Sequence, residues 1–211
     1  GYGSEIGVGV RVPTAPTGNQ FVEWGGLSPD ENDGILWGQD ATGVYVSYVR
    51  GGTKTKVRPD SWNIDALDGN GPSGFNLDTS VGYIYQINYT WYGYGQIIFG
   101  LIAIQPDKEN VGVVNGYKPY QTFIPCHSIK MENSTSLQSP NLKIHVEASN
   151  GGDTSDFDVY IGGRQYSVVG QYVPKFRYIS DIRASTTVGT SIEPLITFRV
   201  KSAFYDRSVK L

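Results

Sequence analysis

Hydrophobic and polar positions alternate with a period of two in several short segments, and no segment shows the period of a helix. The clearest alternation covers residues 83–91, where apolar or aromatic residues occupy the odd positions and Gln86, Asn88 and Thr90 the even ones. Because successive side chains of a strand point to opposite faces, this pattern predicts a half-buried antiparallel strand. The next segment, 97–104, is apolar at nearly every position and predicts a strand covered on both faces.

Six further segments, separated by turn-forming residues, have strand-like patterns: 35–38, 43–49, 54–58, 122–130, 141–147 and 195–201. Residues 156–161 and 164–169 predict a hairpin in which Gly162 and Gly163 form a two-residue turn. Many short strands joined by Gly-rich turns predict an all-β fold, specifically an antiparallel β-sandwich of jelly-roll type.

Two segments lack strand periodicity. Residues 1–18 mix Gly, Pro and Thr, which predicts an extended N-terminal arm or linker before a single domain spanning residues 19–211. Residues 60–78 are dense in turn formers and predict a long ordered loop. We expect Trp62, Leu67 and Leu77 to bury their side chains, and Asp65 and Asp68 to accept hydrogen bonds from backbone amides of the same loop.

Composition and charge narrow the class of protein. The 211 residues include 27 Gly and 15 Tyr, a bias that favours strands and turns. The net charge is −3 and the basic residues are scattered, which predicts no nucleic-acid partner. No apolar run reaches the length of about 18 residues typical of a membrane-spanning helix, so no membrane insertion is predicted. The single cysteine, Cys126, excludes an intrachain disulfide.

The sequence offers weak candidates for catalysis. Cys126 and His127 are adjacent in a predicted strand, so their side chains point to opposite faces and cannot form a nucleophile–base pair. We predict a buried Cys126 and a His127 at an edge or in a loop. Glycosidase-type carboxylate pairs could be drawn from Asp107, Glu109, Asp153, Asp156 and Asp158, but any acidic β-protein offers such pairs. No catalytic residue is assigned.

Oxygen-bearing side chains crowd the loop at Asp65, Asp68, Asn70 and Asp78, and such a set could hold Ca²⁺. The alternative is that Asp and Asn bond the backbone of their own turns, and this alternative is favoured. No other cofactor is predicted.

Tyrosines in or beside Gly-rich turns are candidates for contact with a glycan or a partner protein: Tyr92, Tyr94, Tyr117 and Tyr120. Aromatic rings at such places serve sugar binding, protein interfaces or simple burial. Asn88 and Asn133 each begin an Asn-x-Ser/Thr pattern for N-glycosylation, and Asn133, in a polar segment, is the better candidate.

A succession of motifs resembles a β-rich module found in virion structural proteins of tailed bacteriophages and related environmental viruses. The motifs are Trp37-Gly38-Gln39-Asp40, Trp62-Asn63, Leu67-Asp68-Gly69-Asn70-Gly71-Pro72-Ser73-Gly74, Leu77-Asp78, Trp91-Tyr92-Gly93-Tyr94-Gly95, Phe99-Gly100 and Ser139-Pro140-Asn141-Leu142-Lys143-Ile144. The chain departs from the module at Tyr92 and Tyr94, where the family has an apolar Leu-Gly-Val-Gly turn, and at Lys143, where it has Pro. Surface properties are therefore expected to differ.

The resemblance implies a non-enzymatic component of the virion, either a capsid decoration or part of a head or tail fibre. It also implies that the chain forms a homo-oligomer and that its partners are other virion structural proteins. It supplies no catalytic residues. The alternative is a carbohydrate-binding module or host-adhesion domain that uses the loop aromatics on a host surface glycan. A glycan-cleaving enzyme is a third, less favoured reading.

Overall fold

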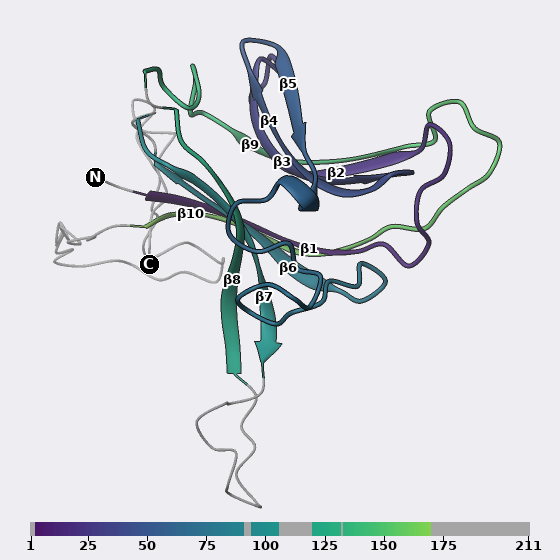
Figure 1. Ribbon diagram of the computed structural model, residues 1–211. Coiled ribbons are helices and arrows are strands. Elements are labelled where there is room, and N and C mark those ends of the chain that lie inside the picture. Colours follow the sequence, from purple (N-terminus) through teal and green to yellow (C-terminus); the bar gives the residue numbers. More distant parts are fainter. Residues whose placement is uncertain (1–2, 91–93, 106–119, 132, 170–211) are drawn as a thin grey trace, which may run out of the picture. The chain divides into compact units, whose positions relative to one another are not determined.

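The computed structural model describes residues 3–90, 94–105, 120–131 and 133–169 (Figure 1). The chain divides into two units, Gly1–Gln171 and Tyr172–Leu211, and every described residue belongs to the first. The strand predicted at residues 195–201 lies outside the described residues.

The described residues form two antiparallel sheets of five strands each, so the predicted all-β class is confirmed (Figure 1). Sheet A has the order β10-β1-β6-β7-β8 and sheet B the order β5-β4-β3-β2-β9. Sheet A contains β1 (Gly3–Arg11), β6 (Tyr83–Thr90), β7 (Ile97–Gln105), β8 (Tyr120–Ile129) and β10 (Tyr160–Val169). Sheet B contains β2 (Phe21–Leu27), β3 (Asp33–Asp40), β4 (Gly43–Arg50), β5 (Thr53–Val57) and β9 (Lys143–Ser149). The short 3₁₀ helix η1 (Pro59–Ser61) follows β5.

The core lies between the inner faces of the two sheets, which makes the architecture a β-sandwich. Trp24 and Trp37 of sheet B meet Tyr85 of sheet A edge to face, with ring centroids 4.8 and 5.0 Å apart. Aliphatic side chains that alternate along the strands fill the remaining space, among them Ile6, Val8, Val22, Ile35, Val46, Ile87 and Leu101. The alternation predicted for β6 is confirmed, because Tyr85, Ile87 and Tyr89 are all buried.

Strand β2 was not predicted, because Glu23, Gly25 and Gly26 interrupt its apolar pattern. Gly25 has a φ of +149°, and a Cβ there would collide with the backbone oxygen of Ile35. A Cβ on Gly26 would lie 2.6 Å from Cδ1 of Ile6 in the facing sheet. Gly25 therefore requires glycine, and at Gly26 a side chain would displace Ile6 in the facing sheet.

Residues 3–11 do not form the predicted arm, because they are strand β1 inside sheet A. The strand pairs with β6 on one side and β10 on the other, and Ile6, Val8 and Val10 are buried in the core. The prediction of an arm or linker over residues 1–18 is wrong here, and a boundary at residue 18 separates β1 from its own sheet. Glycines at Gly7 and Gly9 hide the alternation on the outer face.

The predicted hairpin at residues 156–169 is also wrong, because β10 runs straight through Gly162 and Gly163. Its pairing with β1 shifts in register between Val8 and Val10. At this bulge a Cβ on Gly9 would lie 3.4 Å from the backbone N and O of Gly163. The glycines thus allow two backbones to approach closely, a role that glycine often has at β-bulges.

Strand β7 is covered on one face only, in contrast to the prediction from its continuous apolar run. Phe99 and Leu101 are buried in the core, whereas Ile98 and Ile102 on the opposite face are only half-buried. The outer face of sheet A is therefore partly apolar and accessible.

Candidate functional site

The loop at residues 62–78, which carries most of the family resemblance, is held on the sandwich by its apolar side chains. Trp62 and Leu67 are 8% and 2% exposed, and Leu77 is half-buried against the core. The Trp62 ring packs edge to face on Trp37 with centroids 5.5 Å apart, and its Nε1–H donates to the backbone oxygen of Val57 at 3.1 Å. The predicted burial is confirmed for Trp62 and Leu67, and Leu77 is partly buried.

Asp65 lies at the centre of the loop and holds two of its turns together. Its Oδ1 accepts the N–H of Leu67 and its Oδ2 the N–H of Ser73, both at 2.8 Å. The Asp65 side chain is buried against Gly71, where a Cβ would collide with the carboxylate. The loop then closes on itself, because the N–H of Leu77 donates to the oxygen of Leu67 at 2.8 Å.

Two other predicted calcium ligands, Asp68 and Asp78, also act as acceptors for their own turns, and Asn70 donates to one of them. Asp68 Oδ1 accepts the N–H of Asn70, and Asp78 Oδ1 accepts the N–H of Ser80, each at 2.9 Å. The bond from Asn70 lowers the pKa of Asp68, and the bonds from Ser80 lower the pKa of Asp78. Within the described residues, no three His, Cys, Asp or Glu side chains are grouped so that they could hold a metal ion. The carboxylates of this loop therefore serve as acceptors within its own turns.

The same loop covers the backbone of β8, an edge strand of sheet A. The N–H groups of Ile64 and Asp65 both donate to the oxygen of Cys126, at 3.1 and 3.0 Å. The side chain of Asn63 pairs with the backbone of Ser128, donating to its oxygen at 2.9 Å and accepting its N–H at 2.8 Å. Covering an edge in this way protects it from pairing with other chains.

Cys126 and His127 lie under this contact. Cys126 is buried, as predicted, and burial raises the pKa of its thiol. His127 is on an edge strand, as predicted, but the loop buries it, and its Nδ1 accepts the N–H of Asn63 at 3.2 Å. Burial disfavours the imidazolium and lowers the pKa of His127 from its ordinary value of 6.5.

We therefore expect the free energy of unfolding to decrease as the pH falls below the ordinary histidine pKa of about 6.5, until the pH reaches the lower pKa of folded His127. In that window the unfolded chain binds the proton and the folded chain does not. Urea unfolding between about pH 7.5 and about pH 5.5 measures this slope. His127→Gln should remove it, and His145→Gln, at the chain's other histidine, is the matched control. An unchanged slope in His127→Gln would contradict this assignment.

A charged network covers the outer face of sheet B around Tyr45. Glu23 accepts the Tyr45 hydroxyl at 2.9 Å and pairs with Lys54 at 2.6 Å. Burial and the adjacent Glu23 raise the pKa of Tyr45. Asp40 pairs with Arg58 and Lys56 at 2.7 and 3.1 Å. Burial alone would raise the pKa of Asp40, but hydrogen bonds from Arg58 and Lys56 outweigh it and the pKa is lowered.

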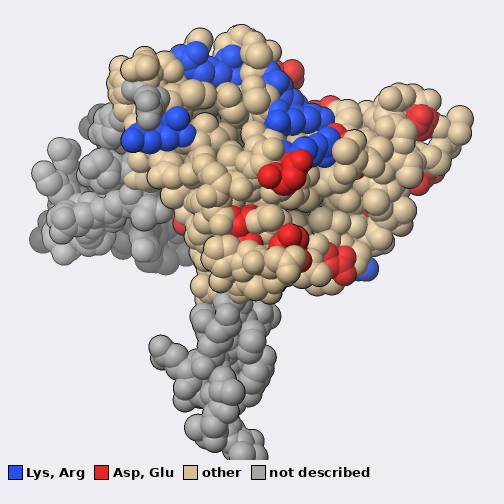
Figure 2. Space-filling model, in the orientation of Figure 1, with Lys and Arg blue, Asp and Glu red and all other residues tan. Residues whose placement is uncertain are grey.

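Lys and Arg side chains gather in a band over this part of the molecule, with acidic side chains at its margin (Figure 2). Lys56 and Arg58 also lie over the Tyr45 ring, 4.2 and 4.9 Å from its centroid. Lys54, Lys56 and Arg58 are therefore engaged within the fold.

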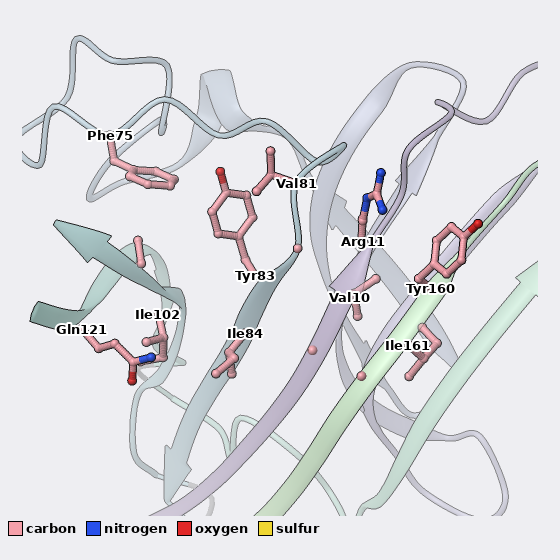
Figure 3. Close-up of a pocket in the computed structure, with 14 residues that line it drawn as sticks. Val10, Arg11, Phe75, Val81, Tyr83, Ile84, Ile102, Gln121, Tyr160 and Ile161 are labelled. Atoms are coloured by element: carbon pink, nitrogen blue, oxygen red, sulfur yellow. The ribbon is translucent and has the colours of Figure 1, made fainter. Parts of the chain in front are cut away.

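A trough lies on sheet A, and sequence reasoning missed it (Figure 3). It consists of two overlapping hollows of about 640 and 530 Å³ that share Gly9, Ile84, Ile102 and Gln121. The first hollow lies at the end of the sheet, where Phe75, Tyr83 and Tyr160 supply aromatic rings. The second extends over the outer face and is lined by Glu5, Gly7, Gln86, Gly163, Arg164 and Gln165. Each strand of sheet A contributes to it.

The candidate tyrosines are only partly placed. Tyr94 is 72% exposed and Tyr120 is the first residue of β8, whereas Tyr92 and Tyr117 lie outside the described residues. The structure does not bring Tyr94 into the trough.

The candidate glycosylation residues and the candidate carboxylate pairs lie in different parts of the structure. Asn133 is exposed in a loop, while Asn88 lies in β6 and accepts a bond from Gln86 at 3.1 Å. Asp153 accepts the N–H of Asn19 at 2.7 Å, and Asp156 accepts from Asn150 at 3.2 Å, so both are used in the loop after β9. Asp107 and Glu109 lie outside the described residues.

The fold and its sites define a β-sandwich with a self-contained structural loop on one edge and an open trough on the outer face of sheet A. No protein-family model, curated protein or solved structure matches the chain. No helix within the described ranges is long and apolar enough to cross a membrane.

Proposed function

We propose that the chain is a non-enzymatic structural component of a virion, either a capsid decoration or part of a head or tail fibre. The chain forms a homo-oligomer and associates with other virion proteins. The loop at residues 62–78 carries this proposal. Residues that resemble the virion module help to fix the loop: Trp62 packs on Trp37, Asn63 binds β8, and Leu67 is buried in the core. A motif that keeps a loop rigid is consistent with a module that assembles with other subunits.

The jelly-roll type of the sandwich belongs to the same proposal. Its support is that the chain passes repeatedly between the two sheets, from β1 to β2, from β5 to β6, from β8 to β9 and from β9 to β10. Such crossings are typical of double-sheet Greek-key arrangements.

Immunogold labelling of virus particles with an antibody against the recombinant chain tests the proposal, together with light scattering of the purified chain. We expect gold at a defined position on the particles and a homo-oligomer in solution. Antibody that has been pre-absorbed with the chain is the control. A stable monomer, together with particles that carry no label either intact or disrupted, would overturn the proposal.

The second candidate function is host adhesion through loop aromatics that bind a surface glycan, and the exposed ring of Tyr94 favours it. Tyr94→Ala should then weaken binding to a host polysaccharide by about tenfold, the factor that corresponds to about 1.4 kcal/mol. Binding that is unchanged in this variant would remove the candidate. Release of reducing ends from the same polysaccharide would instead support a glycan-cleaving enzyme.

A further inference from the structure

Three glycines take part in the floor of the trough on sheet A. Gly9 of β1 lies against Gly163 of β10, Gly7 lies opposite Gln165, and a Cβ on Gly163 would meet no atom within 4 Å. Ile84, which is 44% exposed, and Ile102 add an apolar strip beside the glycines. Figure 3 shows Ile84, Ile102 and Gln121 along one side of the hollow and Ile161 and Tyr160 on the other. A flat, partly apolar ligand could therefore lie close to the backbone.

The rim of the trough is polar and nearly balanced in charge. Gln86, Gln121 and Gln165 supply amides, while Glu5 and Arg164 supply one charge of each sign. No hydrogen bond or ion pair joins the side chains of Glu5, Gln121 or Arg164 to another described residue. Side-chain amides both donate to and accept from hydroxyl groups, a carboxylate accepts from them and a guanidinium donates to them. The mixed rim suits a neutral ligand rich in hydroxyls and offers too little positive charge for a nucleic acid.

The aromatic end of the trough fits the same ligand. Tyr160 is 55% exposed, and the Arg11 guanidinium lies 5.5 Å from its ring centroid. Phe75 and Tyr83 meet edge to face at 5.5 Å nearby. Aromatic faces provide apolar contact for ligands that are polar at their edges, and sugar rings have this character.

The direction of the trough argues against a peptide. It crosses all five strands of sheet A, and four spacings of about 4.8 Å give a path of about 19 Å. A peptide that binds by β-augmentation would instead run along a sheet edge, where it could pair with backbone groups. The elongated form accommodates a linear chain.

We propose that this trough binds a linear neutral polysaccharide. This site is additional to the proposed role in the virion. Among the described residues, it shares none with the candidate glycan site at the loop tyrosines. The sugar rings lie over Gly7, Gly9 and Gly163, their hydroxyls bond to Gln121, Gln165 and Glu5, and one ring packs against Tyr160. A virion component with such a surface would hold the particle on a glycan-coated host.

Affinity electrophoresis of the full chain in gels that contain soluble β-glucan, xylan or glucomannan tests the proposal. We expect at least one of these neutral chains to retard the wild type. Gly163→Leu, which fills the trough at a position with free space, should abolish the retardation, and Gln121→Ala and Gln165→Ala should each weaken it about tenfold. Gln138→Ala is the matched control, because this exposed side chain lies away from the trough and its backbone N–H still donates to Asp33.

Three outcomes would overturn the proposal. The first is that none of the neutral polysaccharides retards the wild type. The second is that Gly163→Leu, with an unchanged circular dichroism spectrum, still binds while Tyr94→Ala does not, which would place the site in the loop. The third is that light scattering shows a dimer that Gly163→Leu dissociates, because the trough would then be covered by a second copy. Particle labelling is independent of all three outcomes.

Discussion

Replacing Trp37 with alanine should destabilise the protein more than any other single truncation. Trp37 is fully buried and joins three parts of the fold, with ring centroids 5.5 Å from Trp62 in the loop and 5.0 and 6.3 Å from Tyr85 and Phe99 in the facing sheet. Removal of a buried tryptophan costs about 3–5 kcal/mol, since its packing is lost and a cavity remains. Domains have a total stability of about 5–15 kcal/mol, so this is a large fraction.

Urea unfolding followed by far-ultraviolet circular dichroism measures this loss as a lower midpoint at an unchanged slope. Trp37→Phe should cost much less, because it keeps an aromatic ring and removes a buried Nε1–H that has no partner among the described residues. Tyr94→Ala is the surface control and should change the stability by no more than about 0.5 kcal/mol. A loss below about 1 kcal/mol in Trp37→Ala would show that the aromatic cluster does not hold the sheets together.

The strands that could be predicted are those with side chains of contrasting polarity on their two faces. In β6 and β9, apolar residues such as Ile87 and Val146 alternate with polar ones such as Gln86 and Glu147, and the period of two is plain. In β1 and β10 the outer positions carry Gly7, Gly9, Gly162 and Gly163. A glycine contributes no side chain to the pattern. The sequence therefore predicted a linker in place of β1 and a hairpin in place of β10.

The turn chemistry of the loop was predictable because it is local. Asp65 bonds residues two and eight positions away, and Asp68 bonds a residue two positions away. The partner of the loop was not predictable, since Asn63 binds Ser128, which is 65 residues away in the sequence. Ser128 lies close to a bulge in the pairing of β7 with β8, and this bulge forms only in the folded sheet. Sequence spacing contains no information on such a contact.

The trough could not be predicted for a related reason. Its lining comes from all five strands of sheet A, from Glu5 to Gln165, and only the strand order makes these residues neighbours. The one available signal was the run of glycines at Gly7, Gly9, Gly162 and Gly163. The same absence of side chains that concealed two strands produces the floor on which the proposed ligand lies. Glycine in an otherwise apolar alternation is therefore a sign of close approach, by a backbone or by a ligand.

Asp65→Ala should destabilise the loop by about 3 kcal/mol, the second largest effect we expect. The substitution leaves the N–H groups of Leu67 and Ser73 without their acceptor, and a hydrogen bond to a charged group contributes about 1.5–3 kcal/mol. Hydrogen exchange at these two amides should accelerate, and the urea midpoint should fall. Asp65→Asn, which retains one acceptor oxygen, should lose less.

Asp68→Asn is the matched control for Asp65→Ala, because Asp68 is exposed and accepts the N–H of Asn70 at the surface of the loop. It should change the stability by no more than about 0.5 kcal/mol. If Asp65→Ala changed it equally little, the loop would owe its form to Trp62 and Leu67 alone. If calcium raised the urea midpoint of the wild type but not that of Asp65→Ala, the carboxylate would be a metal ligand. Both results would contradict the role of Asp65 as the acceptor that joins two turns of the loop.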